Sequence, residues 1–310
     1  MSNPFYQKDI LSIKDFSKSD LSLLFSTVNK IESLEFEERT KICRGKVLAN
    51  LFYEGSTRTK LSFETAMLHI GGNIIGFQDT KGTAIDKGET LSDTIKVVDG
   101  YSDAIILRHP TEGAARFAAE IAEKPLINGG SGSEEHPTQA MVDLYTIIAE
   151  KKEIDGLNIA LVGDLKYGRT VYSLLYGLAK YSPNIFLVAP PQLKIRNEIH
   201  NDLDNKTKMV EIDDVESIID KLDVMYVTRI QKERVPDPAE YEKVKGSYII
   251  DNKLVENAKD SLMILHPLPR VGEIKSEIDN TKYAKYFEQA HNGKKLRASL
   301  LSLMLNEEAI

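Results

Sequence analysis

The sequence contains a single cysteine, Cys43, among its 310 residues. One thiol excludes an internal disulfide framework and any zinc site built from several cysteines of this chain. The sequence also lacks a run of about 20 apolar residues, the length that a membrane-spanning helix requires. Its charged N-terminal stretch has no apolar segment of the signal-peptide type. We therefore expect a protein of a reducing, cytoplasmic compartment without a membrane segment.

Positive charge is scarce as well, because 40 Lys and Arg residues stand against 47 Asp and Glu residues, for a net charge of −7. A general nucleic-acid binder needs a broad basic face, so we expect no nucleic-acid partner. Anionic substrates would instead need local clusters of arginine. The length predicts two domains of about 150 residues each, which is enough to bury sizeable cores.

Short apolar runs alternate with segments of helical spacing, which is typical of βαβ units and parallel sheets. We expect strands near 46–53, 73–77, 103–107, 125–128, 157–163, 184–189, 207–212, 222–227 and 261–265. We expect helices near 57–70, 88–99, 112–122, 137–151, 165–181, 191–203, 213–220, 251–258 and 293–306. The alternation predicts an α/β fold of two doubly wound parallel-sheet domains. A ligand is expected in an interdomain cleft, at the carboxyl ends of the strands.

The segment Ser56-Thr57-Arg58-Thr59 follows a predicted strand and opens a predicted helix. Unpaired N–H groups at a helix start, together with hydroxyls and a guanidinium, form an anion site. A simpler interpretation is that Ser56 or Thr57 only caps the helix. Arg58, however, opposes the helix dipole in the first turn, so this choice makes sense when an external anion binds there. The segment therefore predicts phosphate binding.

Arg108 and His136 also stand where ligands bind in open sheets. Arg108 ends a predicted strand, and alone it would more often be a surface ion-pair partner. His136 precedes a predicted helix start at Pro137, where the dipole favours the neutral imidazole. That imidazole could polarise a carbonyl oxygen by donating a hydrogen bond, or could simply cap its own helix.

The stretch from Gly163 to Thr170, GDLKYGRT, nearly matches the P-loop pattern. Arg169 stands in the place of the required lysine, and Lys166 and Tyr167 make the loop bulky. We therefore do not expect nucleotide hydrolysis.

Two further segments follow predicted strands of the second half. Arg229 and Gln231 are two residues apart, which in an extended segment points both to one side and suits a carboxylate. In His266-Pro267-Leu268-Pro269, the prolines set a rigid turn that could direct a backbone carbonyl towards a ligand. The sequence shows no metal-ligand spacing, no GxSxG nucleophile and no dinucleotide glycine pattern, so we expect no metal and no cofactor.

Taken together, these segments resemble the catalytic chains of the aspartate transcarbamoylase family. The resemblance runs along essentially the whole chain, and the segments that carry it are STRT at 56–59, KGETLSDTI at 87–95, RHP-x-EGAAR at 108–116, HPTQ at 136–139, GDLKYGRT at 163–170, TRIQKER at 228–234 and HPLPR at 266–270. It implies the reaction of carbamoyl phosphate with L-aspartate to give N-carbamoyl-L-aspartate and phosphate, the committed step of pyrimidine biosynthesis. It also implies a carbamoyl phosphate domain, 1–136 with 292–310, and an aspartate domain, 137–291, with 137–151 as the linking helix.

The resemblance assigns the carbamoyl phosphate site to the first domain, where Thr59, Arg108 and His136 would polarise the carbonyl. Gln139 would contact the carbamoyl amide, and Arg58 would act with those three in catalysis. The residues implied to hold this substrate are Ser56, Thr57, Arg58, Thr59, Arg108, His136 and Gln139.

For aspartate, the resemblance implies that Arg169 takes the α-carboxylate. Arg229 and Gln231 would take the side-chain carboxylate, and the Leu268 carbonyl would orient the amine next to a cis bond to Pro269. A neighbouring subunit would contribute Lys87, which makes the active unit a homotrimer with shared sites. The residues implied to link the two domains on closure are Glu54, Arg169 and Arg234.

Many relatives also assemble with a zinc-bearing regulatory chain into an allosteric complex, and the segment 112–116 resembles the part that meets it. The chain departs from the family pattern at Gly55, at Ala84, where a serine usually reaches the phosphate of the adjacent subunit, and at Gly272, where regulated members have an acidic residue.

Two alternatives remain open from the residues. Ornithine transcarbamoylases share the two-domain plan and the phosphate motif, but they carry a cysteine in an HCLP segment, which is HPLP here. A non-catalytic paralogous subunit should have lost some of the arginines or the histidine, and all of them are present.

Overall fold

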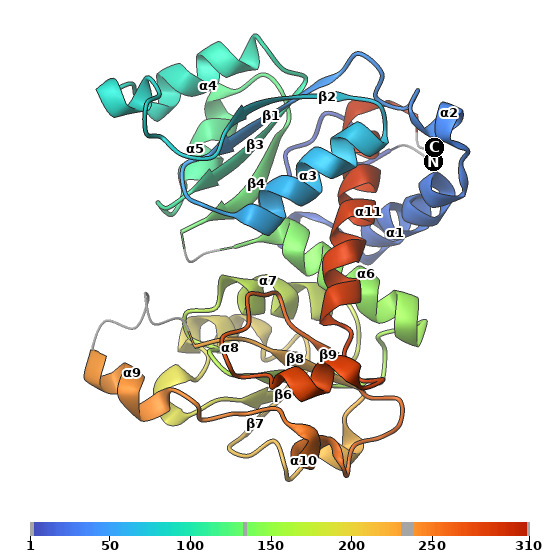
Figure 1. Ribbon diagram of the computed structural model, residues 1–310, viewed down its shortest axis with the longest axis vertical. Helices are drawn as coiled ribbons and strands as arrows, with labels where there is room; N and C mark the ends of the chain where they lie inside the picture. The colour runs from blue at the N-terminus through green and yellow to red at the C-terminus, as the bar shows by residue number, and fades with distance from the viewer. Residues whose placement is uncertain (1–2, 133–134, 231–237, 309–310) are drawn as a thin grey trace. The chain divides into compact units, whose positions relative to one another are not determined.

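The computed structural model describes residues 3–132, 135–230 and 238–308. The chain divides into two compact units, Met1–Val142 with His291–Ile310, and Asp143–Ala290. It passes from one unit to the other within α6 (Pro137–Lys151) and again within α11 (Tyr286–Leu305). Each unit is built on a parallel sheet with helices (Figure 1), so the predicted fold class is confirmed.

In the first unit, the described strands form one parallel sheet in the order β2-β1-β3-β4. Nearly every residue of β1 and β3 is buried, which explains why they appear as continuous apolar runs. In contrast, β2 lies at an edge and is largely exposed. The bounds are β1 (Val47–Phe52), β2 (Asn73–Phe77), β3 (Ala104–His109) and β4 (Leu126–Ser131), close to the predicted runs.

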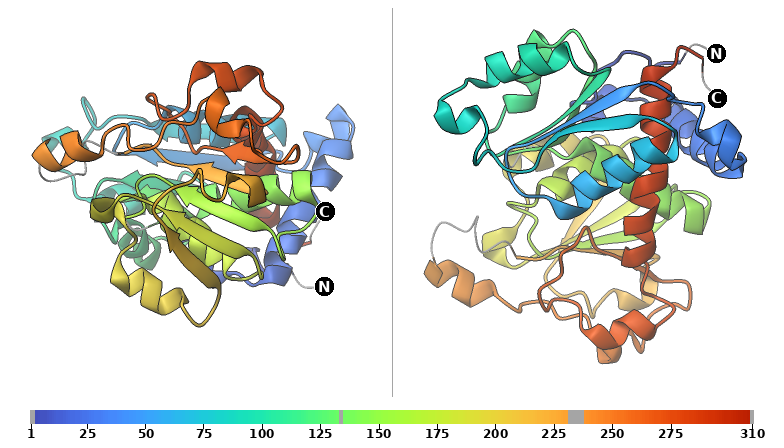
Figure 2. Two further views of the ribbon diagram at one scale, coloured as in Figure 1. Left: turned by 90° about the horizontal axis from the view of Figure 1, so that it is seen from below. Right: turned by 45° about the horizontal axis from the view of Figure 1, so that its top comes forward.

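Helices cover both faces of this sheet (Figure 2). Alternate residues of β1 and β3, among them Leu51 and Leu107, form one core with α4 (Leu91–Asp99) and α5 (Ala114–Ile121). The other face receives α3 (Thr57–His69), whose Phe63 and Met67 are fully buried. The unit also contains α1 (Lys18–Ser33) and α2 (Phe36–Arg39).

The two termini lie side by side in the first unit (Figure 1). The side-chain amide of Asn3 donates to the carbonyl oxygens of Leu303 and Asn306, at 2.7 and 2.9 Å. The segment before α1 also covers the β4 edge of the sheet, because Ile10 forms a parallel bridge with Ile127. This edge is therefore closed, while β2 at the opposite edge is not covered in this way by the described part of the chain.

In the second unit, the described strands form a parallel sheet in the order β7-β6-β5-β8-β9. The strands are β5 (Asn158–Val162), β6 (Asn184–Val188), β7 (Lys208–Ile212), β8 (Val224–Val227) and β9 (Met263–Leu265). The helices include α7 (Arg169–Leu178), α8 (Asn197–Leu203), α9 (Pro238–Val244) and α10 (Asn252–Val255). A core on one face joins Met225 and Val227 of β8 to Leu254 and Val255 of α10.

One predicted helix is wrong. Residues 213–220 form turns that end in a short 3-10 helix, Ile219–Lys221. The carboxylate of Asp214 accepts the N–H of Glu216 at 2.9 Å, and the Asp214 carbonyl accepts the Ser217 hydroxyl at 2.7 Å. These local bonds offer the backbone an alternative to a helix.

The helix predicted over 191–203 is also interrupted, since Pro191–Leu193 forms a 3-10 turn and α8 begins only at Asn197.

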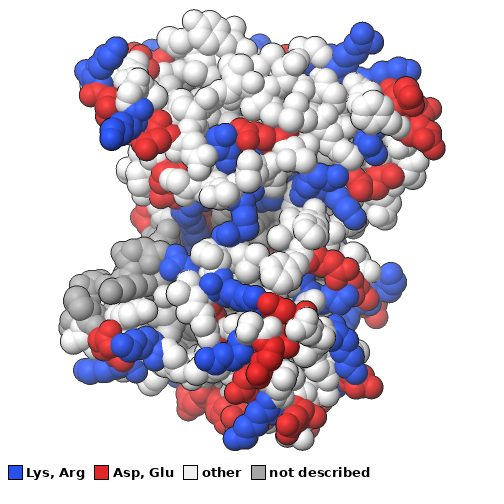
Figure 3. Space-filling model, viewed as in Figure 1, with Lys and Arg blue, Asp and Glu red and all other residues white. Residues whose placement is uncertain are grey.

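Lysine and arginine side chains are interspersed with acidic ones over the face shown in Figure 3. Among the described residues, no helix is long and apolar enough to cross a membrane.

Candidate functional site

The predicted phosphate segment opens α3. Ser56 is the residue before the helix, and its side chain makes no capping hydrogen bond. The simple capping interpretation of Ser56 therefore does not hold in this structure. The first turn contains no acidic residue, and its N–H groups and the exposed Arg58 both contribute positive charge there. This is the arrangement that an anion requires.

Thr59 and His136 come together within the first unit. Both side chains are buried, and the Thr59 hydroxyl lies 3.5 Å from Nε2 of the His136 ring. Thr59 lies in α3, which follows β1, and His136 lies after β4, directly before the start of α6. The sheet therefore brings together two side chains that are 77 residues apart in the sequence.

Arg108 lies in β3, between the strands that precede these two residues. Its side chain is nearly buried, at 8% exposure. One terminal nitrogen donates to the Gly129 carbonyl at 3.0 Å, and the other lies 2.7 Å from the Glu54 carboxylate. Arg108 is thus held from two sides. A freely rotating side chain would lose conformational entropy on adopting this orientation.

The first unit therefore places a hydroxyl, a guanidinium and an imidazole at the carboxyl ends of adjacent strands or in the segments that follow them. Such donors can stabilise a developing oxyanion and bind phosphate, provided that they are already oriented. Of the remaining residues predicted for this half, Ser56 and Gln139 are partly buried, while Thr57 is exposed. Lys87 ends a short 3-10 turn, Ile85–Lys87, and is exposed.

His109 follows Arg108 and packs against Tyr53, with ring centres 4.7 Å apart. Its Nδ1 accepts the N–H of Thr111 at 3.0 Å. Burial lowers the pKa of His109, although the Glu54 carboxylate opposes this shift. The imidazole is therefore neutral at pH 7 and supports the turn that follows Arg108.

The sole cysteine is not a candidate nucleophile. Cys43 is fully buried, and burial raises the pKa of its thiol to about 12. The thiol stays protonated at neutral pH and behaves as a small apolar group.

In the second unit, the loop after β5 is tied to the end of β8. The N–H of Asp164 donates to the Thr228 hydroxyl at 3.0 Å. Gly163 has a φ of +117°, and a Cβ there would lie 2.2 Å from the Thr228 carbonyl oxygen. Only glycine fits this close approach, which brings the segment before Arg169 next to the segment that contains Arg229.

Arg169 begins α7 and is 9% exposed, while Arg229 is partly buried. The loop between β5 and α7 is further shaped by Asp164, whose carboxylate accepts the N–H groups of Lys166 and Tyr167 at 3.2 and 2.9 Å. This carboxylate anchor was not anticipated from the sequence. Its signal was an acidic residue directly after the glycine that ends a strand.

The turn after β9 has the predicted cis bond between Leu268 and Pro269, and Leu268 has a φ of +57°. Leu268 is partly buried and Pro269 is exposed. Gln231 and Arg234, which were also predicted here, lie outside the described residues. Glu54, predicted to join Arg169 and Arg234, pairs with Arg108 in this structure.

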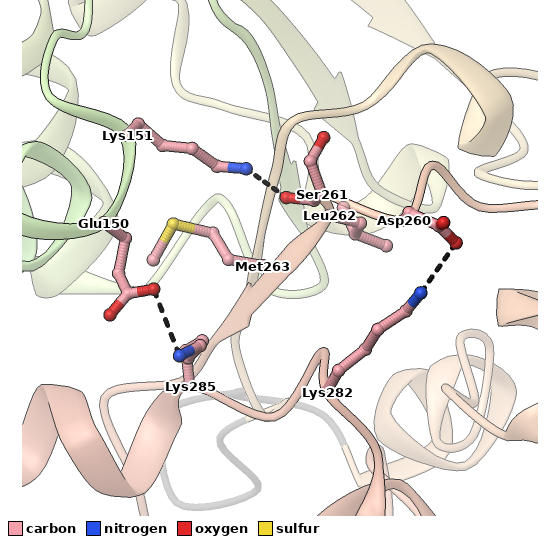
Figure 4. A pocket seen from close by; sticks show the side chains of 8 residues that line it. All are labelled: Glu150, Lys151, Asp260, Ser261, Leu262, Met263, Lys282 and Lys285. Atoms are coloured by element: carbon pink, nitrogen blue, oxygen red, sulfur yellow. Dashed lines mark hydrogen bonds and ion pairs between the residues drawn. The ribbon is translucent and has the colours of Figure 1, made fainter.

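A hollow of ≈ 260 Å³ in the second unit lies elsewhere (Figure 4). Its lining includes the residues just before β9, at the amino end of that strand, whereas the predicted aspartate residues follow carboxyl ends. Two ion pairs lie among its lining residues. Lys285 pairs with Glu150 at 3.1 Å, and Lys282 pairs with Asp260 at 2.6 Å. Lys151 donates to the Ser261 carbonyl. None of the predicted site residues lines this hollow.

Within the described part of the chain, no group of three or more His, Cys, Asp or Glu residues could hold a metal ion.

The sequence matches two family descriptions over nearly its full length. Residues 8–149 match "Aspartate/ornithine carbamoyltransferase, carbamoyl-P binding domain", and residues 155–304 match "Aspartate/ornithine carbamoyltransferase, Asp/Orn binding domain". The chain is 57% identical over 305 residues to the aspartate carbamoyltransferase catalytic subunit of Nitrosopumilus maritimus (strain SCM1), covering 98% of this chain and 99% of that protein. It is 50% identical to the corresponding subunit of Thermofilum pendens, covering 98% and 96%.

Solved structures show the same fold. The aspartate transcarbamoylase of Trypanosoma cruzi in complex with carbamoyl phosphate and aspartate superposes with a TM-score of 0.94, at 35% identity and 98% coverage of both chains. The catalytic subunit of the M. jannaschii enzyme superposes with a TM-score of 0.88, at 48% identity, covering 95% of this chain and 97% of that one.

Proposed function

The chain belongs to the aspartate/ornithine carbamoyltransferase family, and we propose that it transfers the carbamoyl group of carbamoyl phosphate to the amine of L-aspartate. The observation that carries this proposal is the contact between Thr59 and His136, together with the place of Arg108 on β3, between the two strands that lead to them. These groups suit a reaction that needs charge stabilisation and no protein nucleophile.

The reaction begins when the neutral amine of aspartate attacks the carbonyl carbon of carbamoyl phosphate. A tetrahedral oxyanion develops, and it accepts hydrogen bonds from Thr59, Arg108 and His136. The carbon–oxygen bond to phosphate then breaks, and the departing phosphate can take the amine proton. Oriented donors of this kind each contribute about 10²–10³ in rate. Holding both substrates in register contributes up to about 7–11 kcal/mol.

Carbamoyl phosphate binding belongs, in this proposal, to 1–136 with 292–310. Its phosphate lies at the start of α3, where the exposed Arg58 and the first-turn N–H groups meet it. Ser56, Thr57 and Arg108 add further hydrogen bonds, and Gln139 binds the carbamoyl amide.

Aspartate binding belongs to 137–291, in which 137–151 is the link to the first domain. Arg169 binds the α-carboxylate, Arg229 and Gln231 bind the side-chain carboxylate, and the Leu268 carbonyl accepts a hydrogen bond from the amine. The tether between Asp164 and Thr228 supports this arrangement, because it holds together the loops that contain Arg169 and Arg229. Closure of the two domains would join Glu54 to Arg169 and Arg234.

A homotrimer is the proposed active unit, with Lys87 of one subunit completing the site of its neighbour. Support comes from an apolar face in the first unit. Leu61 and Leu68 of α3 are 55% and 60% exposed and lie seven residues apart, on one side of the helix. Exposed apolar side chains on one side of this helix suit burial against another subunit.

We further propose that the enzyme acts in the cytoplasm in pyrimidine biosynthesis, as part of an allosteric complex with a zinc-bearing regulatory chain. The segment 112–116 at the start of α5 would meet that chain. The exposed Phe117, at 49%, gives this end of the helix an apolar contact surface. Gly272 stands where regulated relatives have an acidic residue, so cooperativity is expected to be weak. Ala84 stands in place of the serine that contacts the phosphate, so carbamoyl phosphate is expected to bind less tightly.

The decisive experiment is a carbamoyl-transfer assay on the purified chain with aspartate or ornithine as acceptor. We expect carbamoylaspartate and no citrulline, because arginines suit a second carboxylate and the HPLP turn lacks cysteine. Citrulline formation would overturn the aspartate assignment, and no product with either acceptor would favour a non-catalytic subunit.

A further inference from the structure

The turn that presents Leu268 is held by a buried histidine. His266 is 1% exposed, and its Nδ1 accepts the backbone N–H of Leu268 at 2.7 Å. A nitrogen that accepts cannot carry the ring proton, so the proton lies on Nε2. Nε2 lies 2.7 Å from Oε1 of Glu273 and therefore donates to it. The carboxylate thus selects the tautomer that can hold Leu268.

Glu273 closes the turn on its other side. Its second oxygen accepts the N–H of Val271 at 2.9 Å. The two carboxylate oxygens therefore bind a side chain before the cis bond and a backbone group after it. Burial raises the pKa of Glu273, but the bonds from His266 and from the Val271 N–H outweigh it, and the net pKa is lowered. The group is a carboxylate at neutral pH.

The same histidine is fixed from the core. Its backbone N–H donates to Oε1 of Gln289 at 2.8 Å, and Nε2 of Gln289 donates to Asp143 at 2.7 Å. Asp143 and Gln289 are almost fully buried. Asp143 also acts on Tyr226, since burial and then the charge of Asp143 raise the pKa of that phenol well above its usual value. Residues of α6 and α11 thus hold the position from which the turn departs.

We propose that His266 and Glu273 are positioning residues for the aspartate amine, with His266 setting the backbone of Leu268 and Glu273 setting His266. The inference rests on the proposed function, in which the Leu268 carbonyl accepts from that amine. A misplacement of about 1 Å at such a contact can cost about 10²-fold in rate. The Leu268 N–H and its carbonyl belong to the same short turn, so losing the histidine bond would allow this displacement.

The test compares aspartate with succinate, the same dicarboxylate without the amine. For His266→Leu, which keeps apolar bulk but removes the acceptor, we expect kcat/KM for aspartate to fall about 10²-fold. Inhibition by succinate should stay at the wild-type level, and so should KM for carbamoyl phosphate. His266→Asn should recover most of the activity, because an asparagine oxygen can accept the N–H two residues later.

A second variant covers the case in which His266→Leu does not fold. Glu273→Gln keeps the shape and replaces a charge-assisted bond by a weaker neutral one, so we expect kcat/KM for aspartate to fall about tenfold, with succinate again unaffected. Asp260→Asn is the control, since its exposed ion pair with Lys282 lies in the same unit, and it should behave as wild type.

Equal losses for aspartate and succinate would show a general structural role and overturn the inference. The inference would also be overturned if His266→Leu showed wild-type kinetics. Where that variant does not fold, wild-type kinetics of Glu273→Gln would overturn it. Wild-type protein that forms no carbamoylaspartate would instead overturn the proposed function, and the inference with it.

Discussion

The guanidinium of Arg108 lies 2.7 Å from the carboxylate of Glu54 while it also donates to the Gly129 carbonyl. The pair joins the end of β3 to the loop after β1, at the carboxyl end of the first sheet. The Glu54 carboxylate is therefore bound to the Arg108 guanidinium in this structure, and an anionic substrate would compete with it for that guanidinium. Gly129 would still hold the guanidinium if Glu54 turned away.

Arg108→Lys tests this geometry. Lysine keeps the charge but cannot reach two acceptors with a planar fork, so we expect kcat to fall about 10²–10³-fold in the carbamoyl-transfer assay. Lys46→Gln is the control, because Lys46 pairs with Asp103 in the same unit through partly exposed side chains. An Arg108→Lys enzyme with normal turnover would remove Arg108 from the proposed chemistry.

Arg58→Ala should cripple turnover far more than it changes aspartate affinity, because the proposed role of Arg58 is to bind the phosphate. A fall in kcat of about 10²–10³-fold is expected, read from full kinetics in both substrates. Lys60→Ala, on the same helix, removes only an ion pair with Glu64 and should have little effect. A normal rate combined with a raised aspartate KM would contradict the role given to Arg58.

Gly163→Ala should destabilise the second unit. The added Cβ would lie 2.2 Å from the Thr228 carbonyl oxygen, so the backbone must shift. Gly156→Ala is the matched control, since Gly156 has a φ of +77° but open space around it. We expect Gly163→Ala to cost about 1–3 kcal/mol more than the control in urea unfolding, together with a raised aspartate KM. Equal costs would show that the close approach to Thr228 is unimportant.

Glu273→Gln should make stability less dependent on pH. A carboxyl whose folded pKa is lowered stabilises the fold above its unfolded value, near 4.5, and this stabilisation is lost as the pH falls through the folded pKa. At pH 7 we expect the variant to be less stable by about 1.5–3 kcal/mol. The difference should shrink at pH values below 4.5, as followed by denaturant unfolding across pH. A difference that stays constant would exclude a contribution from the charge.

Leu68→Glu should weaken self-association, because it places a charge on the apolar face of α3. Sedimentation velocity of the purified chain would measure it, with a trimer expected for the wild type and smaller species for the variant. Val210→Glu introduces the same charge on an exposed residue of β7 in the second unit and should leave the trimer intact. A variant that sediments like the wild type would place the interface elsewhere.

The strands and most helices could be predicted from the sequence because their signals are local. β1 and β3 are runs of buried apolar residues, and the start of α3 is marked by hydroxyl residues and an arginine. The helix predicted over residues 213–220 was wrong because Asp214 stabilises a turn through hydrogen bonds with Glu216 and Ser217. A helical spacing of apolar residues does not reveal these bonds.

By itself, the sequence determined the fold class and the family and led to the proposed substrate-binding segments, since the signal for each lies in short stretches of chain. Only the tertiary structure decided which side chains meet. Arg108 pairs with Glu54, and Gln289 donates to Asp143, 146 residues away. His266 donates to Glu273 while it holds Leu268. Such pairs form because packing of helices on parallel sheets removes water and leaves each buried polar group dependent on a neighbour, which no local pattern specifies.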